Sequence, residues 1–416
     1  MIITDKSIII TLAVPIFLFL IVVEYFYGLK VGKNNYKLSD TFTSLGLGLI
    51  SRFPAMLNLG FQGAVFVYVG SSLNLKLMPL DNPFTWIIGF VLYDLSYYWM
   101  HRMHHEVKVL WATHSVHHHG EEFNLSTALR QTSTGWLWKW VFYLPMIMIG
   151  VPGQVFVTVA GVNLVYQFWV HTKHIGHLGV LEKIFVTPMN HGIHHAKNQE
   201  YIDANYGGVF ILWDRIFGTY ISEKPEVKPV YGTVKPLNSW NPIWANFQVF
   251  YQMVQDTIYT EKVTDKIKIW YGPTSWRPED MLAENFEVSP SDFYKKYAPA
   301  INNQQKVFTI IQLFSVVIFA AIMATTTSLQ AYYETAIFGL ILVLIVVSTS
   351  LILQNKRHSF NIQLGVSSFL IVFIYFGGVV DAALLAAQFI ILHAVINVLY
   401  ISIYNLVKTQ SKMKIL

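Results

Sequence analysis

The chain has 416 residues, of which 54% are hydrophobic and 13% are charged, and its formal net charge is +5. Soluble domains carry about 25% charged residues, so this composition, with a mean hydropathy of +0.43, excludes an ordinary soluble protein and predicts a membrane protein. In such a protein an excess of Lys and Arg is typical of cytoplasmic loops, and we expect no nucleic-acid partner. The chain has no cysteine, which excludes disulfides and thiolate-held clusters, so any metal must have nitrogen and oxygen ligands.

Apolar stretches long enough for a membrane helix recur along the chain. A bilayer core of about 30 Å needs about 20 apolar helical residues. We therefore expect an all-α, polytopic helical membrane protein. About nine spans are expected, over residues 7–29, 43–70, 83–100, 136–151, 153–170, 306–326, 333–353, 359–377 and 379–405. Arg52 and Pro54 interrupt the second of these, and the fourth and fifth are short enough to form a helical hairpin that does not fully cross.

The basic residues are distributed unevenly between the expected loops. If the N-terminus lies outside, the outer segments hold only Lys6 and Lys76. The inner loops hold the histidine-rich region together with Lys30, Lys33, Lys37, Lys356, Arg357, Lys408, Lys412 and Lys414. By the positive-inside rule this asymmetry predicts a cytoplasmic C-terminus and a histidine-rich region on the cytoplasmic face. The membrane would be a bacterial inner membrane or one of the endoplasmic-reticulum type.

The stretch from residue 171 to 305 differs in character from the rest of the chain. It contains no apolar span, and it has several prolines and acidic residues. We expect a cytoplasmic cap of short helices and irregular loops. Residues 1–300, with the cap at 171–300, would form one domain, and residues 301–416 would form a C-terminal four-helix transmembrane module.

Thirteen of the 15 histidines lie between His101 and His195. Histidines four residues apart share one helix face and can converge on one ion, whereas adjacent histidines point about 100° apart and suit two ions side by side. A single zinc site uses about four ligands, so eight histidines with such spacing suffice for two metals. The eight are His101, His105, His114, His117, His118, His191, His194 and His195. We expect structural or secondary roles for His104, His119, His174, His177, His358 and His393.

An acidic residue precedes the first cluster. Asp94 lies two helical turns before His101 on the same face, and Tyr97 lies one turn before it. An acid inside a span is costly and usually has a partner. We expect Asp94 to accept the N–H of a ligand histidine, or else to pair with Arg102 or Arg130 for structure alone.

Three histidine boxes in this order after a span resemble the fatty acid hydroxylase/sterol desaturase superfamily of integral membrane non-haem di-iron enzymes. The stretch Asp94-Leu-Ser-Tyr-Tyr-Trp-Met-His101-Arg resembles the segment that leads into its first box. His101 to His105 matches the H-x3-H box, His114-Ser-Val-His117-His118 matches the H-x2-H-H box, and His191-Gly-Ile-His194-His195 matches the last box. Met189-Asn190 departs from the Ser-His that often precedes the last box.

Further stretches are similar to the alkylglycerol monooxygenase branch of that superfamily. The resemblance covers about residues 80–300 closely and the remainder in layout. The matching stretches are Glu121-Glu-Phe-Asn124-Leu-Ser-Thr127-Ala-Leu-Arg130-Gln131, Trp169-Val-His171-Thr172, Asn205-Tyr206-Gly207-Gly208, Trp213-Asp214-Arg215-Ile-Phe217-Gly218-Thr219 and Trp270-Tyr-Gly272-Pro273.

The resemblance implies a hydroxylase that activates O2 at two irons and inserts one oxygen atom into a lipid C–H bond. In that branch the substrate is an ether lipid, and tetrahydrobiopterin supplies the electrons. It makes His171 a ninth ligand, and it places Glu106 at an acidic position that would serve the metal shell or the reductant. Polar residues expected to support the histidines or hold the lipid head group are Asn124, Thr127, Arg130, Gln131 and Asp214.

Other functions stay open at this point. Desaturation on the same centre also begins with hydrogen abstraction. A zinc-dependent membrane hydrolase would need a general-base carboxylate, as in H-E-x-x-H, which is absent. A metal transporter would have histidines or acids inside several spans, whereas the histidines here cluster outside the spans, and we take His393 and Asp94 as the candidates inside them. There is no cytochrome b5-like H-P-G-G stretch and no Gly-rich dinucleotide fingerprint, so we expect an external electron donor besides O2 and the membrane lipid substrate.

Overall fold

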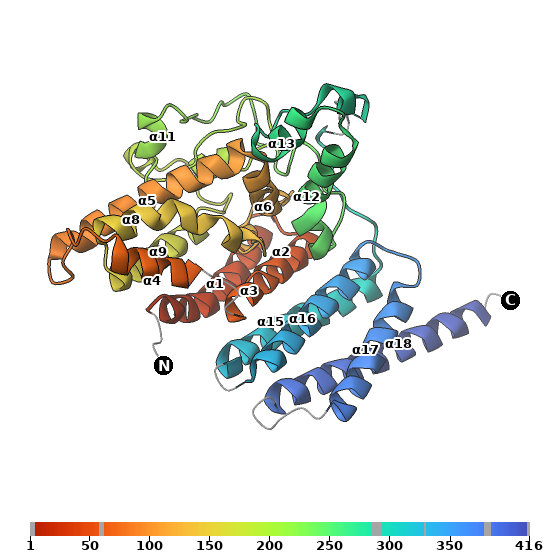
Figure 1. Ribbon diagram of the computed structural model, residues 1–416. Coiled ribbons are helices and arrows are strands. Elements are labelled where there is room, and N and C mark those ends of the chain that lie inside the picture. The colour runs from red at the N-terminus through yellow and green to blue at the C-terminus, as the bar shows by residue number, and fades with distance from the viewer. Residues whose placement is uncertain (1–4, 58–61, 285–292, 328–329, 378–383, 414–416) are drawn as a thin grey trace. The chain divides into compact units, whose positions relative to one another are not determined.

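The computed structural model describes residues 5–57, 62–284, 293–327, 330–377 and 384–413 (Figure 1). Within these residues the chain forms helices joined by loops, with isolated β-bridges and no strand. The expected all-helical fold class is therefore confirmed. By their internal contacts the residues divide into two compact units.

The first unit comprises Met1–Lys37, Gly60–Leu237 and Asn246–Lys296. Within it α1 packs against α9, α9 against α5, and α5 against α6. Its helices are α1 (Asp5–Lys30), α4 (Gln62–Ser72), α5 (Pro83–Glu106), α6 (Lys108–His118), α7 (Leu125–Ala128), η1 (Gly135–Leu137), η2 (Lys139–Tyr143), α8 (Leu144–Ile149), α9 (Gly153–Trp169), η3 (Gly179–Lys183), α10 (Pro188–His194), α11 (Leu212–Ile216), α13 (Val263–Tyr271) and η4 (Glu279–Glu284).

The second unit comprises Leu38–Leu59, Asn238–Ala245 and Tyr297–Leu416. It is thus larger than the module expected over residues 301–416, because two earlier segments pack with the C-terminal helices. Its helices are α2 (Leu38–Ile50), α3 (Phe53–Met56), α15 (Asn303–Thr326), α16 (Tyr332–Leu353), α17 (Ser359–Phe376) and α18 (Leu384–Met413). Helix α12 (Pro242–Tyr259) begins in this unit and continues in the first from Asn246 onward.

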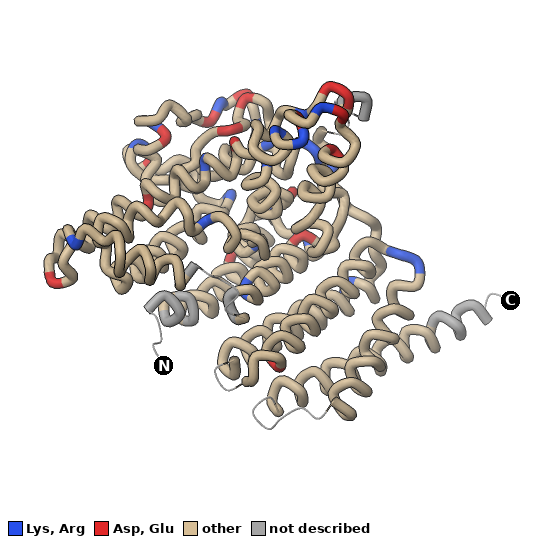
Figure 2. The backbone as a smooth tube through the Cα atoms, viewed as in Figure 1, with Lys and Arg blue, Asp and Glu red and all other residues tan. Residues whose placement is uncertain are grey.

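Five of the described helices are long and apolar enough to cross a membrane. They are Leu12–Lys30, Asn303–Thr326, Tyr332–Leu353, Ser359–Phe376 and Leu384–Val407. The protein is therefore an integral membrane protein, but the count of nine spans is not confirmed. Figure 2 shows few charged residues on α15 to α18, with basic residues in the loop after α16, where the sequence has Lys356 and Arg357.

The four remaining expected spans have identifiable differences from a membrane helix. The 43–70 stretch is divided among α2, α3 and α4, with a turn at Ser51 and Arg52. The 136–151 stretch breaks into two 3-10 helices and the six-residue α8, which starts at Leu144-Pro145, since proline suits a first turn but not a helix interior. Helix α9 has only 17 residues, and α5 carries Asp94 and several tyrosines within its 24 residues.

The ends of α5 position the first histidine box. Asn82 accepts a hydrogen bond of 2.9 Å from the backbone N–H of Phe84, and Pro83 occupies the first helical position, where its missing N–H costs nothing. The helix ends at Glu106, and Val107 adopts an extended conformation before α6 begins at Lys108. One residue therefore separates the helix that bears the first box from the helix that bears the second.

Candidate metal centre

The last turns of two consecutive helices and one short helix carry the three boxes. His101 and His105 lie in the final turns of α5, and the second box lies at the end of α6. The third box lies on α10, whose start is fixed by Thr187 as N-cap and Pro188 as first residue. His171 follows α9 directly after its C-cap, Val170. All four segments belong to the first unit.

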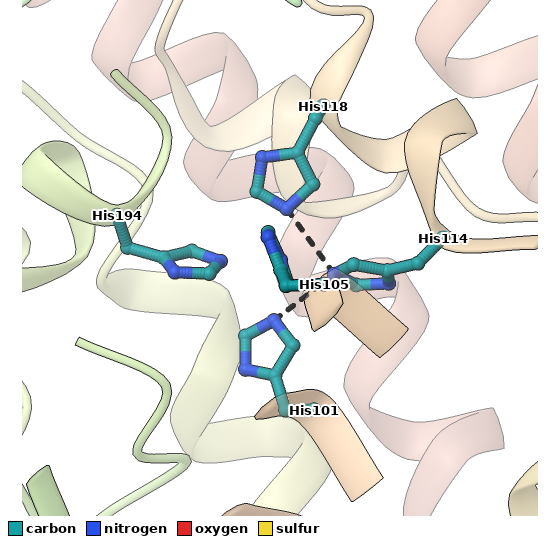
Figure 3. A group of neighbouring side chains, drawn as sticks. All are labelled: His101, His105, His114, His118 and His194. Atoms are coloured by element: carbon teal, nitrogen blue, oxygen red, sulfur yellow. Dashed lines mark hydrogen bonds between the residues drawn. The ribbon is translucent and has the colours of Figure 1, made fainter. Parts of the chain in front are cut away.

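The nine predicted ligands come together in two groups. In each group, one candidate ligand atom per residue lies within 4.8 Å of the others, and every residue is buried. Group A consists of His101, His105, His114, His118 and His194, and group B consists of His117, His171, His191 and His195. Figure 3 shows the imidazoles of group A converging from three segments of the chain. Two adjacent pairs are divided between the groups. His118 and His194 belong to group A, and their neighbours His117 and His195 belong to group B.

The Nε2 atoms of these rings face one another. In group A the Nε2 of His114 lies 3.0 Å from that of His101 and 3.1 Å from that of His118. In group B the Nε2 of His191 lies 2.9 Å from that of His171 and 3.1 Å from that of His195. Metal–nitrogen bonds of about 2.0–2.1 Å place neighbouring ligands of one ion roughly 3 Å apart. The separations therefore fit rings that share an ion.

Backbone carbonyls contact the Nδ1 atom of several of these histidines. The Nδ1 of His101 lies 2.8 Å from the carbonyl of Tyr206, and the Nδ1 of His194 lies 2.9 Å from that of Ala204. In group B the Nδ1 of His117 and of His171 lie 2.9 and 2.8 Å from the carbonyls of Arg130 and Gln167. A carbonyl accepts only, so Nδ1 carries the proton and Nε2 presents a bare lone pair to the centre of the group.

The electrostatics of the groups suit metal binding. Burial lowers the pKa of His101, His118 and His195 well below 6.5, and the neighbouring imidazoles lower these pKa values further. Neutral imidazole is the form that binds metal. Facing lone pairs repel one another unless a cation lies between them, and the buried Nε2 atoms of His105 and His194 have no hydrogen-bond partner among the described residues. The two groups could therefore each hold a metal ion.

The four other histidines of this region lie outside both groups. The Nδ1 of His104 donates to the carbonyl of Met100 at 2.6 Å, and the ring lies 5.9 Å from that of Phe142. His174 packs edge-on against Tyr27 with ring centroids 5.1 Å apart. His177 is exposed and lies 3.0 Å from the carboxylate of Glu182.

Asp94 anchors a loop rather than a ligand ring. Its carboxylate accepts hydrogen bonds from the backbone of Val209 at 2.8 Å and of Phe210 at 3.0 Å. The indole of Trp213 and the amide of Asn163 donate to it at 3.0 and 2.7 Å. These partners differ from the histidine N–H and from the arginines expected. The same stretch of loop supplies the carbonyls of Ala204 and Tyr206, which face His194 and His101.

Asp214 supports the same loop from the other side. It accepts the backbone N–H groups of Tyr206 at 2.7 Å and Gly207 at 2.8 Å, and the hydroxyl of Thr219 at 2.7 Å. Tyr206 in turn presents its carbonyl to His101. The carboxylate therefore stands two contacts away from group A.

Tyr97 and Glu106 occupy different surroundings on α5. The ring of Tyr97 lies 5.3 Å from that of His101 and against Gly208, where a Cβ would come within 2.8 Å of the tyrosine ring. Glu106 is partly exposed and forms an ion pair of 2.7 Å with Arg102. It belongs to neither histidine group.

The polar residues after the second box mostly bond among themselves. Asn124 and Thr127 form the capping box of α7, and Thr127 also donates to the carbonyl of Glu122 at 2.9 Å. Gln131 donates to the carbonyl of Ala128 at 3.1 Å. Arg130 is fully buried, and its backbone carbonyl is the group that faces His117.

A carboxylate that was not predicted to matter lies behind group B. Glu24 of α1 is buried and accepts hydrogen bonds from the hydroxyl of Thr172 at 2.5 Å and the backbone of Leu125 at 2.8 Å. The hydroxyl of Tyr36 also donates to it. Thr172 follows His171, so Glu24 ties α1 to the segment that carries His171. The sequence did indicate a role for Glu24, because it is the one acidic residue in the apolar stretch 7–29, and such a residue usually has a partner.

Comparison with known proteins decides the family. The fatty acid hydroxylase family model matches residues 86–219, a range that includes both histidine groups. The chain is 36% identical over 309 residues to alkylglycerol monooxygenase from Danio rerio, with 73% of this chain and 68% of that protein covered. The chain belongs to the fatty acid hydroxylase family. This hydroxylase is also 35% identical over 303 residues to alkylglycerol monooxygenase from Homo sapiens, with 72% and 67% covered.

The alkylglycerol monooxygenase of Xenopus tropicalis is 40% identical to the hydroxylase over 246 residues, which cover 58% of this chain and 54% of that protein. No solved structure matches the hydroxylase significantly. Its relatives establish an oxygen-dependent lipid hydroxylase, an oxidoreductase, and its apolar helices place it in a membrane. The resemblance inferred from the histidine boxes is confirmed.

Proposed function

We propose that the enzyme hydroxylates an ether lipid of the alkylglycerol type at a centre of two iron ions, with one ion in each histidine group. The observation that carries this proposal is the division of nine buried histidines into two groups. Two irons would supply the activation of O2 and the insertion of one oxygen atom into an aliphatic C–H bond. Group A offers five imidazoles and group B offers four.

The chain's own residues orient the ligands and exclude water. Carbonyl contacts of His101, His117, His171 and His194 fix the tautomer and the direction of each ring. Phe123 lies 5.4 Å from the ring of His195 and stacks on Tyr231 at 4.8 Å. Tyr206 lies 5.2 Å from the ring of His105. These rings surround the histidines with apolar surface, which supports oxidation chemistry by keeping bulk water out.

The choice of iron over zinc rests on the absence of a catalytic carboxylate. Both groups contain only histidine among the described residues. A zinc hydrolase needs a carboxylate general base beside the metal, and Glu106 instead pairs with Arg102 at the surface. Imidazole binds iron as well as zinc, so a ligand set of imidazoles alone is compatible with iron.

We assign the substrate from the names of the relatives, and the side of the membrane from the distribution of basic residues. The relatives are named alkylglycerol monooxygenases, so we assign an ether-linked alkylglycerol as substrate. Tetrahydrobiopterin or a separate electron-donor protein would reduce the irons, since the chain has no cysteine for an iron–sulfur cluster. We assign the histidine groups to the cytoplasmic side from the distribution of Lys and Arg over the loops of the sequence, by the positive-inside rule.

The test uses purified protein reconstituted in lipid vesicles with an alkylglycerol, a pterin reductant and isotopically labelled O2. We expect one labelled oxygen atom in the lipid product by mass spectrometry. An acylglycerol of equal chain length, with an ester in place of the ether, is the matched substrate control and should react much more slowly. A product that has lost two hydrogens without gaining oxygen would show a desaturase instead.

A further inference from the structure

Helix α12 buries polar as well as apolar side chains, but its exposed face is apolar. From Asn246 to Tyr259 its exposed residues are all apolar or aromatic: Phe247, Tyr251, Val254, Ile258 and Tyr259. Their exposed fractions range from 40% to 65%. Asn246 and Asp256, by contrast, are 3% and 2% exposed. A helix that faces water shows the opposite pattern.

Helix α13 continues this surface. Val263, Ile267 and Tyr271 stand four residues apart on one helix face, and each is at least 64% exposed. The charges at the junction of the two helices nearly cancel, because Glu261 and Asp265 alternate with the lysines there. The surface formed by these eight exposed apolar and aromatic residues, five on α12 and three on α13, is called here the apolar face.

The buried side of the two helices is fixed to the helix that carries the second histidine box. Met253 of α12 and Ile269 of α13 pack in one cluster with Val109 and Ala112 of α6. Asp256 forms an ion pair of 2.8 Å with Arg277. These contacts hold the helices in the orientation that exposes the apolar face.

We propose that the apolar face lies in the surface of the lipid bilayer, with acyl chains against Phe247, Val254 and Ile258. Large exposed apolar surfaces mark interaction sites, and this one belongs to the same unit as the apolar helix Leu12–Lys30, which is long enough to cross a bilayer. Tyrosines on the face suit the boundary between head groups and acyl chains. The balanced charge favours zwitterionic lipid over an acidic protein partner.

This placement would fix the distance of the candidate metal centre from the surface of the bilayer. Packed helix axes lie about 8–10 Å apart, and α6 bears His114, His117 and His118. A bilayer-bound α13, which packs against α6, would therefore keep three candidate ligands about one helix diameter from the lipid surface. The placement does not depend on the identity of the metal or of the substrate.

Site-directed spin labelling tests the proposal without measuring activity. Because the chain has no cysteine, each of the variants Phe247→Cys, Val254→Cys and Ile258→Cys carries a unique labelling site. The labelled full-length protein is reconstituted in phosphatidylcholine vesicles, and collision rates of the label with O2 and with a water-soluble nickel chelate are compared. Ile318→Cys, in the middle of the apolar helix α15, serves as the lipid control, and Glu200→Cys, on an exposed polar loop, serves as the water control.

We expect the ratio of O2 to nickel collisions at all three positions to match Ile318→Cys and to exceed Glu200→Cys several-fold. A ratio like that of Glu200→Cys would overturn the proposal and show a water-exposed face. Low collision rates with both reagents would also overturn it, because they would show a face covered by protein. The three positions are exposed, so cysteine there should not disturb folding. If one variant fails to fold, the other two still test the proposal.

Discussion

Thr172 donates a hydrogen bond of 2.5 Å to Glu24, which stands 148 positions earlier in the chain. The same carboxylate accepts the backbone N–H of Leu125, the first residue of α7. One acid on the first membrane helix thus holds the segment after His171 and the segment after the second histidine box. This contact joins the membrane anchor to group B.

Replacing Glu24 should weaken both the fold and the second metal position. Glu24→Ala leaves two buried donors, of Leu125 and Thr172, without an acceptor, and each such loss costs about 1–3 kcal/mol. We expect a lower melting temperature and a reduced metal content in the purified protein. Tyr36→Phe is the matched control, because it removes one donor and keeps the carboxylate. Equal metal content in Glu24→Ala and the parent would contradict the assignment.

Adjacent histidines should differ sharply in their effect on metal binding. His118 belongs to group A, whereas His119 belongs to neither group, although both are buried. His118→Ala should abolish turnover and reduce bound metal, while His119→Ala should retain both. Elemental analysis and turnover of the two variants, purified in parallel, provide the comparison. Comparable losses in both would mean that the histidines act through packing rather than ligation.

Loosening the loop that faces His101 should lower metal affinity. Asp214→Ala frees the backbone of Tyr206 and Gly207, so the carbonyl that orients His101 loses its support. Loss of such support to a ligand typically costs about 10–100-fold in metal affinity. Competition with a chelator measures the change. Thr219→Val removes only one of the donors to Asp214 and should change affinity much less.

Metal-free protein should lose stability on acidification. Burial lowers the pKa of His194 from 6.5 to about 4 in the folded state. Below 6.5 the unfolded chain takes up a proton that the folded chain does not, so stability falls as pH decreases towards about 4. The melting temperature of chelator-treated protein should therefore be lower at pH 5 than at pH 7. A melting temperature that is constant or rises on acidification would show that these rings are not neutral and buried.

Sequence spacing predicted the histidine pairing because helix geometry alone decides it. Four-residue spacing placed His101 with His105 and His114 with His118, and adjacency separated His117 from His118. The partners of Asp94 could not be predicted in this way. They depend on the loop at Val209 and Phe210, which is 115 and 116 positions away and has no periodic pattern.

Hydropathy predicted the C-terminal helices well and the central ones poorly. The stretches 306–326 and 333–353 lie within α15 and α16, where long apolar runs are uninterrupted. The 136–151 stretch has similar residues, but Pro145 and a left-handed Gly150 confine its α-helix to six residues. The role of Glu24 was also missed, because its partners lie in distant segments.

Metal analysis of the purified full-length protein tests the central claim most directly. We predict two iron ions per chain, because two separate groups of buried imidazoles face inward. Loss of one group, as in His171→Ala, should lower the iron content towards one. A parent protein that holds a single zinc ion and no iron would contradict the two-iron hydroxylase.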